Sequence, residues 1–407
     1  MVVLLVPVIF GLMGFAVDLG RLYSARNDLK VAANSMAQAA AAELAGTSIA
    51  LENATTAGNY AISTSNGRGN LYDFGGNQIG QSNGVLNSET PTLNFYDTVA
   101  SALGTEGATG GEAGATTARH VKVTVRGEAP LVFWRFLSLA QEGRLNLVAQ
   151  AVAGVSAPVC QACGIEPIAL QAISRDDTTD FGFTVGSRYT LGYLCTGGPA
   201  PGAITNTVQR VPYVLLNRYN ESATILAEEN TQLYRIGALG LPPNTDSTFS
   251  CVRYNAEETI WVNAAPLACN QNRVSTQITT FLCGLAARFD NATVPAACNA
   301  VAETDTILSA SNVDTDISDL DDYTAYTGNR RRVITVPIVD TASTATMVVL
   351  GFRQFLIEPN TNDVTLNVAD TNGRFAALYL GTVMPVKAGR FDGCSLTTGP
   401  GKVVLHQ

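Results

Sequence analysis

Hydrophobic side chains run from residue 1 to residue 17 without a charge, and the pattern then becomes amphipathic. Behind this apolar run, apolar or small residues recur at alternating spacings of three and four, which predicts a single helical stripe. Alanine-rich residues 34–45 favour helix, and Gly46 suits a C-terminal cap. The pattern predicts a long helix within residues 1–46, whose stripe would pack under the chain's own globular part or against other copies. The stripe is formed by Leu22, Ala25, Leu29, Ala32, Met36 and Ala40.

The uncharged residues 1–17 are compatible with a membrane anchor. At about 1.5 Å per residue they would extend roughly 25 Å, slightly less than a bilayer core of about 30 Å. A secretory signal would carry a basic n-region and an A-x-A cleavage site, and neither is present, so a retained anchor is favoured over a cleaved peptide. Asp18 and Arg21 would then mark the membrane–water interface. The amphipathic ring of Tyr23 suits the same position.

Residues 47–157 predict a small α+β unit. Residues 121–125 and 145–151 alternate apolar and polar side chains as strands do, and the aromatic segment 129–139 between them is expected to be helical. The sheet would pack on the first helix. Residues 47–117 are expected to be loosely structured, with flexible glycine-rich loops.

The stretch GFAVDLGRLY resembles the N-terminal signature of TadG-like (TadE/TadG) proteins of the tight-adherence, or Flp/Tad, pilus system. A second likeness is the strand–P-x-x-F-x-x-x-L–strand pattern within residues 118–155. The resemblance implies a minor pilin or pseudopilin whose first helix packs on other pilus subunits through the stripe. Leu5 stands where pilins of the shaft carry Glu, which favours a terminal or accessory place. The signature is matched by Gly14, Ala16, Val17, Asp18, Leu19, Gly20, Arg21, Leu22 and Tyr23.

Residues 158–407 predict a β-rich, sandwich-like domain, because short apolar runs such as VITVPIV are typical of strands in a buried sheet. One helix is expected near residues 276–289. The expected strands are 166–173, 181–194, 211–217, 258–264, 331–340, 345–357, 363–368 and 374–386.

All eight cysteines lie in this second region, and their even count and scattered positions favour structural disulfides in an oxidising compartment. Cys160 and Cys163 form a C-x-x-C pair, for which redox chemistry and zinc binding are the less favoured alternatives. Eight cysteines allow about 105 pairings, so the connectivity stays open. The disulfide candidates are Cys160, Cys163, Cys195, Cys251, Cys269, Cys283, Cys298 and Cys394.

Composition excludes some classes of function. A chain of 407 residues with 46% hydrophobic residues can form two or three packed units, and a net charge of −9 argues against binding nucleic acid. With only two histidines, and neither a G-x-S-x-G nor an H-E-x-x-H motif, histidine-based hydrolysis is disfavoured. A two-carboxylate glycosidase is a minor alternative. No motif for a cofactor was found.

The most acidic stretch is residues 303–323. Asp314, Asp316 and Asp319 are weak calcium candidates because carboxylates are hard oxygen ligands. The EF-hand spacing fails, so a solvated acidic loop is the favoured interpretation. The basic triplet at residues 330–332 is expected at the edge of a loop facing this stretch.

Two functions from different classes remain. The favoured one is a structural and assembly component of a pilus, contributing to initiation, tip formation or surface adhesion. The alternative is a membrane-tethered binding module for a glycan or another surface ligand, which uses the helix only as an anchor. Either would place the chain in the bacterial inner membrane with its main part in the periplasm, or in an extracellular pilus.

Overall fold

The computed structural model divides the chain into two compact units, which are described separately. Unit 1 comprises residues 1–155 and 403–407, and unit 2 comprises residues 156–402. The residues described are 2–62, 90–104, 112–131, 133, 144–193, 210–216, 251–254, 272–289, 298, 313–340, 347–360, 364–370, 372–391 and 393–406.

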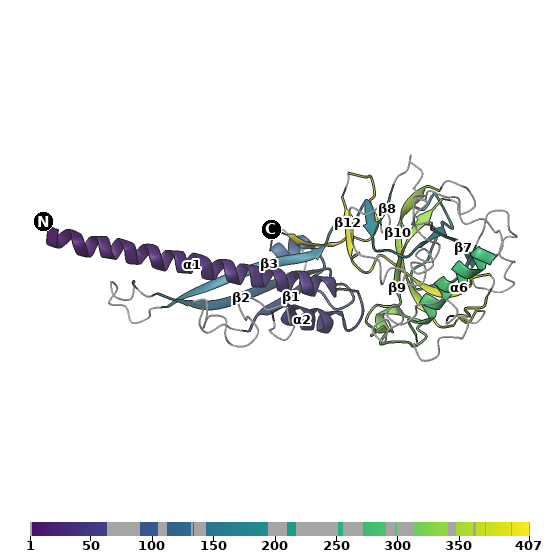
Figure 1. Ribbon diagram of the computed structural model, residues 1–407, viewed down its shortest axis with the longest axis horizontal. Helices are drawn as coiled ribbons and strands as arrows, with labels where there is room; N and C mark the ends of the chain where they lie inside the picture. The colour runs from purple at the N-terminus through teal and green to yellow at the C-terminus, as the bar shows by residue number, and fades with distance from the viewer. Residues whose placement is uncertain are drawn as a thin grey trace. The chain divides into compact units, whose positions relative to one another are not determined.

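Unit 1 is a long helix on a four-stranded antiparallel sheet, as the α+β prediction required. Helix α1 (Val2–Ala42) is continuous, and Gly46 adopts a left-handed φ of 75° after its end. The sheet order is β1-β2-β3-β13, and the C-terminal strand β13 joins it beside β3. Figure 1 shows α1 lying along the sheet, with its N-terminal end projecting past the strands. The strands are β1 (Thr92–Tyr96), β2 (His120–Pro130), β3 (Arg144–Val155) and β13 (Val403–His406).

The core of unit 1 lies between α1 and the sheet. Val121, Val123 and Val125 alternate inward from β2 and are fully buried against α1. Helix α2 (Ala50–Ala61) packs closely on α1, because a Cβ atom at Gly58 would lie only 3.4 Å from the Cβ of Ala40. The expectation of loose structure was therefore wrong for α2, for β1 and for the short helix α3 (Val99–Leu103).

Two predictions for unit 1, the transmembrane segment and the aromatic helix, are not confirmed. Among the described helices, none combines the length and the hydropathy that crossing a bilayer requires. The predicted transmembrane segment is therefore not confirmed. The aromatic segment 129–139 lies largely outside the described residues, which include only Phe133 after Leu131.

Unit 2 is built on a six-stranded closed barrel in the order β10-β11-β6-β7-β5-β9. The predicted sandwich was wrong, because β10 and β9, at the two ends of this order, also pair with each other and close the sheet into one layer, in which β5 and β9 are parallel. β6 and β7 are also parallel, and the other pairs are antiparallel. The barrel strands are β5 (Ile168–Gln171), β6 (Arg188–Tyr193), β7 (Arg210–Leu215), β9 (Val333–Val339), β10 (Val349–Glu358) and β11 (Phe375–Gly381).

Helix α6 (Asn272–Ala286) adds its apolar face to the barrel core, so the helix predicted around Cys283 is confirmed. Phe281 contacts Tyr213 and Phe375 at ring-centroid distances of 5.9 and 5.8 Å, which bury its aromatic surface against β7 and β11. The strand expected at 363–368 is wrong, since Thr365 makes only an isolated bridge. The strand expected at 258–264 lies outside the described residues.

A second, three-stranded sheet of unit 2 has the order β12-β4-β8. Its strands are β12 (Ala388–Arg390), β4 (Gln161–Cys163) and β8 (Cys251–Arg253). The acidic stretch leads through the 3₁₀ helix η4 (Tyr323–Ala325) into β9. This connection carries a polar network described below.

Candidate functional site

The signature residues Gly14 and Asp18 lie one helical turn apart on α1, and both contact the segment at Phe133. The Asp18 carboxylate accepts the backbone N–H of Phe133 at 2.9 Å. A Cβ atom at Gly14 would lie 2.7 Å from the Cβ of Phe133, closer than such atoms approach, so a side chain here would force the segments apart. Gly14 and Asp18 therefore hold the Phe133 segment against the helix.

Asp18 is used inside unit 1. Its side chain is 3% exposed, and its carboxylate contacts the Phe133 segment. Tyr23 is 76% exposed and Arg21 is exposed as well. The role of these three residues at a membrane–water interface stays a prediction.

The predicted packing stripe lies against the chain's own sheet. Ala25, Leu29, Ala32, Met36 and Ala40 are at most 2% exposed, and Leu22 packs on the same core. The expectation that a second subunit packs on this stripe conflicts with that burial, because unit 1 already covers it.

Large apolar side chains are exposed on the N-terminal half of α1 instead. We call this surface the N-terminal apolar segment, and it comprises residues 9–19. Its members leave about half or more of their surface in contact with solvent, which is costly for a helix that contacts nothing else. They are Ile9 (49%), Leu12 (65%), Met13 (61%), Val17 (49%) and Leu19 (54%).

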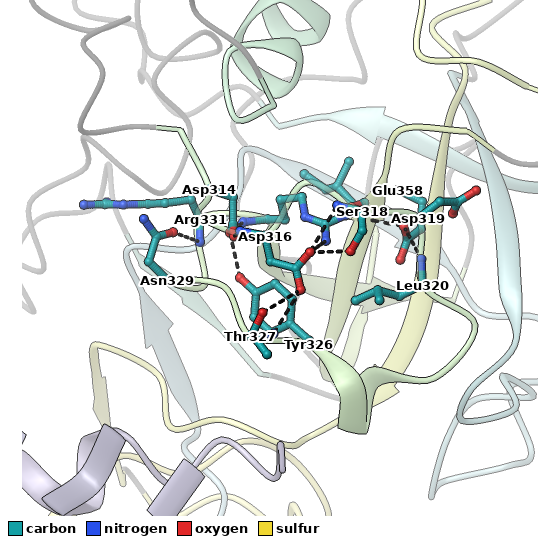
Figure 2. Close-up of polar contacts among 12 residues, drawn as sticks. Asp314, Asp316, Ser318, Asp319, Leu320, Tyr326, Thr327, Asn329, Arg331 and Glu358 are labelled. Atoms are coloured by element: carbon teal, nitrogen blue, oxygen red, sulfur yellow. Dashed lines mark hydrogen bonds and ion pairs between the residues drawn. The ribbon is translucent and has the colours of Figure 1, made fainter. Parts of the chain in front are cut away.

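In unit 2, Asp314 and Asp316 organise the acidic stretch through protein donors (Figure 2). The Asp314 carboxylate accepts the Tyr326 hydroxyl at 2.6 Å and the Arg332 backbone N–H at 2.9 Å. Asp316 accepts the backbone N–H groups of Ser318 and Thr327 at 3.1 and 3.0 Å. Although burial acts in the opposite direction, these hydrogen bonds lower the pKa of Asp316.

A buried, hydrogen-bonded pair of an arginine and a glutamate lies beside this loop. Arg332 and Glu358 are each fully buried, and Nη1 of Arg332 lies 3.4 Å from Oε2 of Glu358. The same oxygen accepts the Leu320 backbone N–H at 3.3 Å. Burial raises the pKa of Glu358 to about 8, although Arg332 and this N–H favour the ionised form. Arg332 is thus in the interior and not at the loop edge where the basic triplet was expected.

The calcium candidates do not converge on a common point. Asp319 instead forms an ion pair with Arg188 at 3.0 Å, and Asp314 and Asp316 use their oxygens on neighbouring N–H and O–H groups. Within the described ranges, no group of three or more His, Cys, Asp or Glu side chains is arranged to hold a metal. The stretch from 313 to 323 is a hydrogen-bonded structural loop, and the solvated loop favoured from the sequence was wrong for Asp314 and Asp316, which are 2% and 9% exposed.

Six of the cysteines form disulfides, which confirms the structural interpretation. The bonds are Cys160–Cys394, Cys163–Cys251 and Cys283–Cys298. Because Cys160 and Cys163 bond to different distant partners, they are not a redox pair or half of a zinc site. Cys195 and Cys269 lie outside the described residues.

Sequence reasoning missed the buried pair of Arg288 and Glu166. Arg288 follows α6, and its Nη2 donates to Oε1 of Glu166 while Nη1 donates to the carbonyl of Arg331 at 3.2 Å. Both side chains are almost fully buried. A charged residue within an otherwise apolar stretch, such as Glu166 before IALQ, was the available signal.

One segment of the chain matches a known protein family. Residues 1–43 match the family model of putative Flp pilus-assembly TadE/G-like proteins, so the resemblance is confirmed there. No curated protein and no solved structure matched the chain. The matched domain associates the chain with Flp/Tad pilus assembly and the cell envelope, and it includes Gly14, Asp18 and the stripe.

Proposed function

We propose that the chain is a non-enzymatic structural component of a Flp/Tad-type pilus, a minor pilin or pseudopilin that contributes to pilus initiation or to the pilus tip. The N-terminal apolar segment carries this proposal. It lies inside the family match and presents large apolar side chains that unit 1 does not cover. Burying such side chains against other subunits or lipid stabilises each by about 1.5–3 kcal/mol.

The two halves of α1 have different roles in this proposal. Residues from Ala25 to Ala41 hold the helix on its own sheet, and residues 9–19 make the contacts of assembly. Unit 2 has no part in those contacts in this proposal.

Paired substitutions in α1 test the proposal in the native host. Leu12→Glu with Leu19→Glu should abolish pili or the retention of this chain in the pilus fraction, because charges would enter the buried contact. The fold should persist, since both side chains are exposed. Asn27→Glu, an exposed change on the same helix, is the matched control and should leave pili unchanged.

A third variant separates folding from assembly. Leu29→Glu introduces a charge into the core of unit 1 and should reduce the amount of soluble, protease-resistant protein. Normal pilus number and normal retention of the Leu12→Glu, Leu19→Glu chain would refute the assembly role of this segment. A gene deletion that leaves pili unchanged would refute the proposed function as a whole.

A further inference from the structure

Unit 2 contains a hollow of about 290 Å³ beside the barrel. Its size is at the lower end of small-molecule sites, which suits one ring of a sugar. Four parts of the chain form it: the loop that follows β5, the residue after β8, the start of β10, and the segment after Cys394. The hollow belongs entirely to unit 2, and the assembly role proposed above does not involve it.

The walls of this hollow are fixed before any ligand binds. Cys394 is bonded to Cys160 next to lining residue Ser395, and Cys251 is bonded to Cys163 three residues before lining residue Tyr254. Such fixed walls lower the entropic cost of binding.

A buried arginine ties two of the walls together. Arg353 is fully buried on β10, and its Nη2 donates to the carbonyl of Thr179 and to Oγ1 of Thr398, at 2.9 Å for the latter. Oγ1 of Thr398 in turn donates to the carbonyl of Thr178 at 2.8 Å. These hydrogen bonds join the loop at Thr178 and Thr179 to the segment at Thr398, in addition to the disulfides.

Phe181 supplies an apolar wall at a conformational cost. Its backbone φ is 56°, in the left-handed region that bulky residues avoid. The guanidinium of Arg353 lies 4.5 Å from its ring centroid, and a Cβ atom at Gly351 would lie 3.0 Å from the ring. The surroundings thus hold the ring in place despite the strained backbone, which is common at binding sites.

The chemistry of the lining indicates the ligand. Leu350 and Leu396 offer apolar surface for the C–H face of a sugar ring, and Tyr254, Ser395 and Thr397 offer hydroxyl groups. Arg175 contributes a positive charge, and the residues that line the hollow include no Asp or Glu. We propose that this hollow binds one acidic sugar unit, a hexuronate of an extracellular polysaccharide, with Arg175 on its carboxylate.

Calorimetry and saturation-transfer NMR on the full chain, with D-glucuronate as probe, test this proposal. Binding should saturate with a dissociation constant of about 1 mM, as expected for so small a ligand. D-glucose should bind about tenfold more weakly, because it lacks the charge that pairs with Arg175. No saturable glucuronate binding, equal binding of glucose, or tighter binding of inorganic phosphate would overturn the proposal.

Three variants assign the binding to the hollow. Arg175→Ala should weaken glucuronate binding about tenfold and leave glucose unchanged, whereas Arg331→Ala removes the same charge from a residue outside the lining and should change neither. Ser395→Trp should block both sugars, because a bulky side chain at this exposed position fills the hollow. Unchanged binding by Arg175→Ala and Ser395→Trp would overturn the assignment.

Discussion

Replacing Glu358 with glutamine should make unit 2 more stable at alkaline pH. The fully buried Glu358 carboxyl has a pKa raised from 4.5 to about 8 in the folded chain. The folded state therefore binds a proton more tightly than the unfolded state. The stability that protonation of Glu358 contributes to the folded state is complete below pH 4.5 and is lost as the pH rises through about 8.

The shift sets the size of the effect. The difference between 4.5 and about 8 is about 3.5 pKa units, which at about 1.4 kcal/mol per unit corresponds to roughly 5 kcal/mol at most. Glutamine keeps an oxygen for the Leu320 N–H and for Arg332 and carries no charge to desolvate. Glu358→Gln should match the wild type near pH 5 and exceed its unfolding free energy by about 3–5 kcal/mol at pH 8.5.

Urea unfolding at the two pH values measures this difference, and hydrogen exchange of the β9 and β10 amides assigns it to unit 2. Glu52→Gln, an exposed change in unit 1, is the matched control. A difference between Glu358→Gln and wild type that stays constant from pH 5 to pH 8.5 would show that Glu358 titrates normally and would refute the reasoning.

Two further substitutions test buried charges. Asp18→Ala should destabilise unit 1 by about 1.5–3 kcal/mol in thermal unfolding, because it leaves the Phe133 N–H without this acceptor. Asp18→Asn keeps an acceptor oxygen and should recover most of the loss. Equal losses in the two variants would contradict the hydrogen-bond argument. Glu166→Gln should destabilise unit 2 by about 3 kcal/mol because Arg288 stays charged in the interior, and wild-type stability in urea would argue against a buried ion pair.

Local pattern predicted the parts of the fold that depend on local sequence. The alternation of Val121, Val123 and Val125 with polar residues specifies one buried face of β2, and the structure places it on α1. The stripe on α1 is a three-to-four repeat of the same kind. Periodicity identifies such a face because it follows from the geometry of a single element.

Long-range pairing could not be predicted in this way. The barrel depends on long-range pairs such as Leu170 with Ile338, and a buried strand in a barrel has the same apolar run as one in a sandwich. The prediction of a solvated acidic loop was wrong at Asp314 for a related reason. Asp314 is buried only because Tyr326 and the Arg332 backbone supply its hydrogen bonds. Composition records the charge of a residue and gives no information on its partner.

The position of Asp18 connects the signature with the exposed apolar surface. At about 100° per residue, Gly14 and Asp18 fall on the same side of α1 as Leu29 and Met36, so they continue the buried stripe towards the N-terminus. The hydrogen bond from Phe133, 115 residues away in the chain, holds that side inward. Leu12 and Leu19 project roughly 100–120° around the helix from Asp18, off the buried side, which agrees with exposures of 65% and 54%. A buried carboxylate in an apolar helix therefore fixes the rotation of α1 and determines which apolar side chains remain exposed.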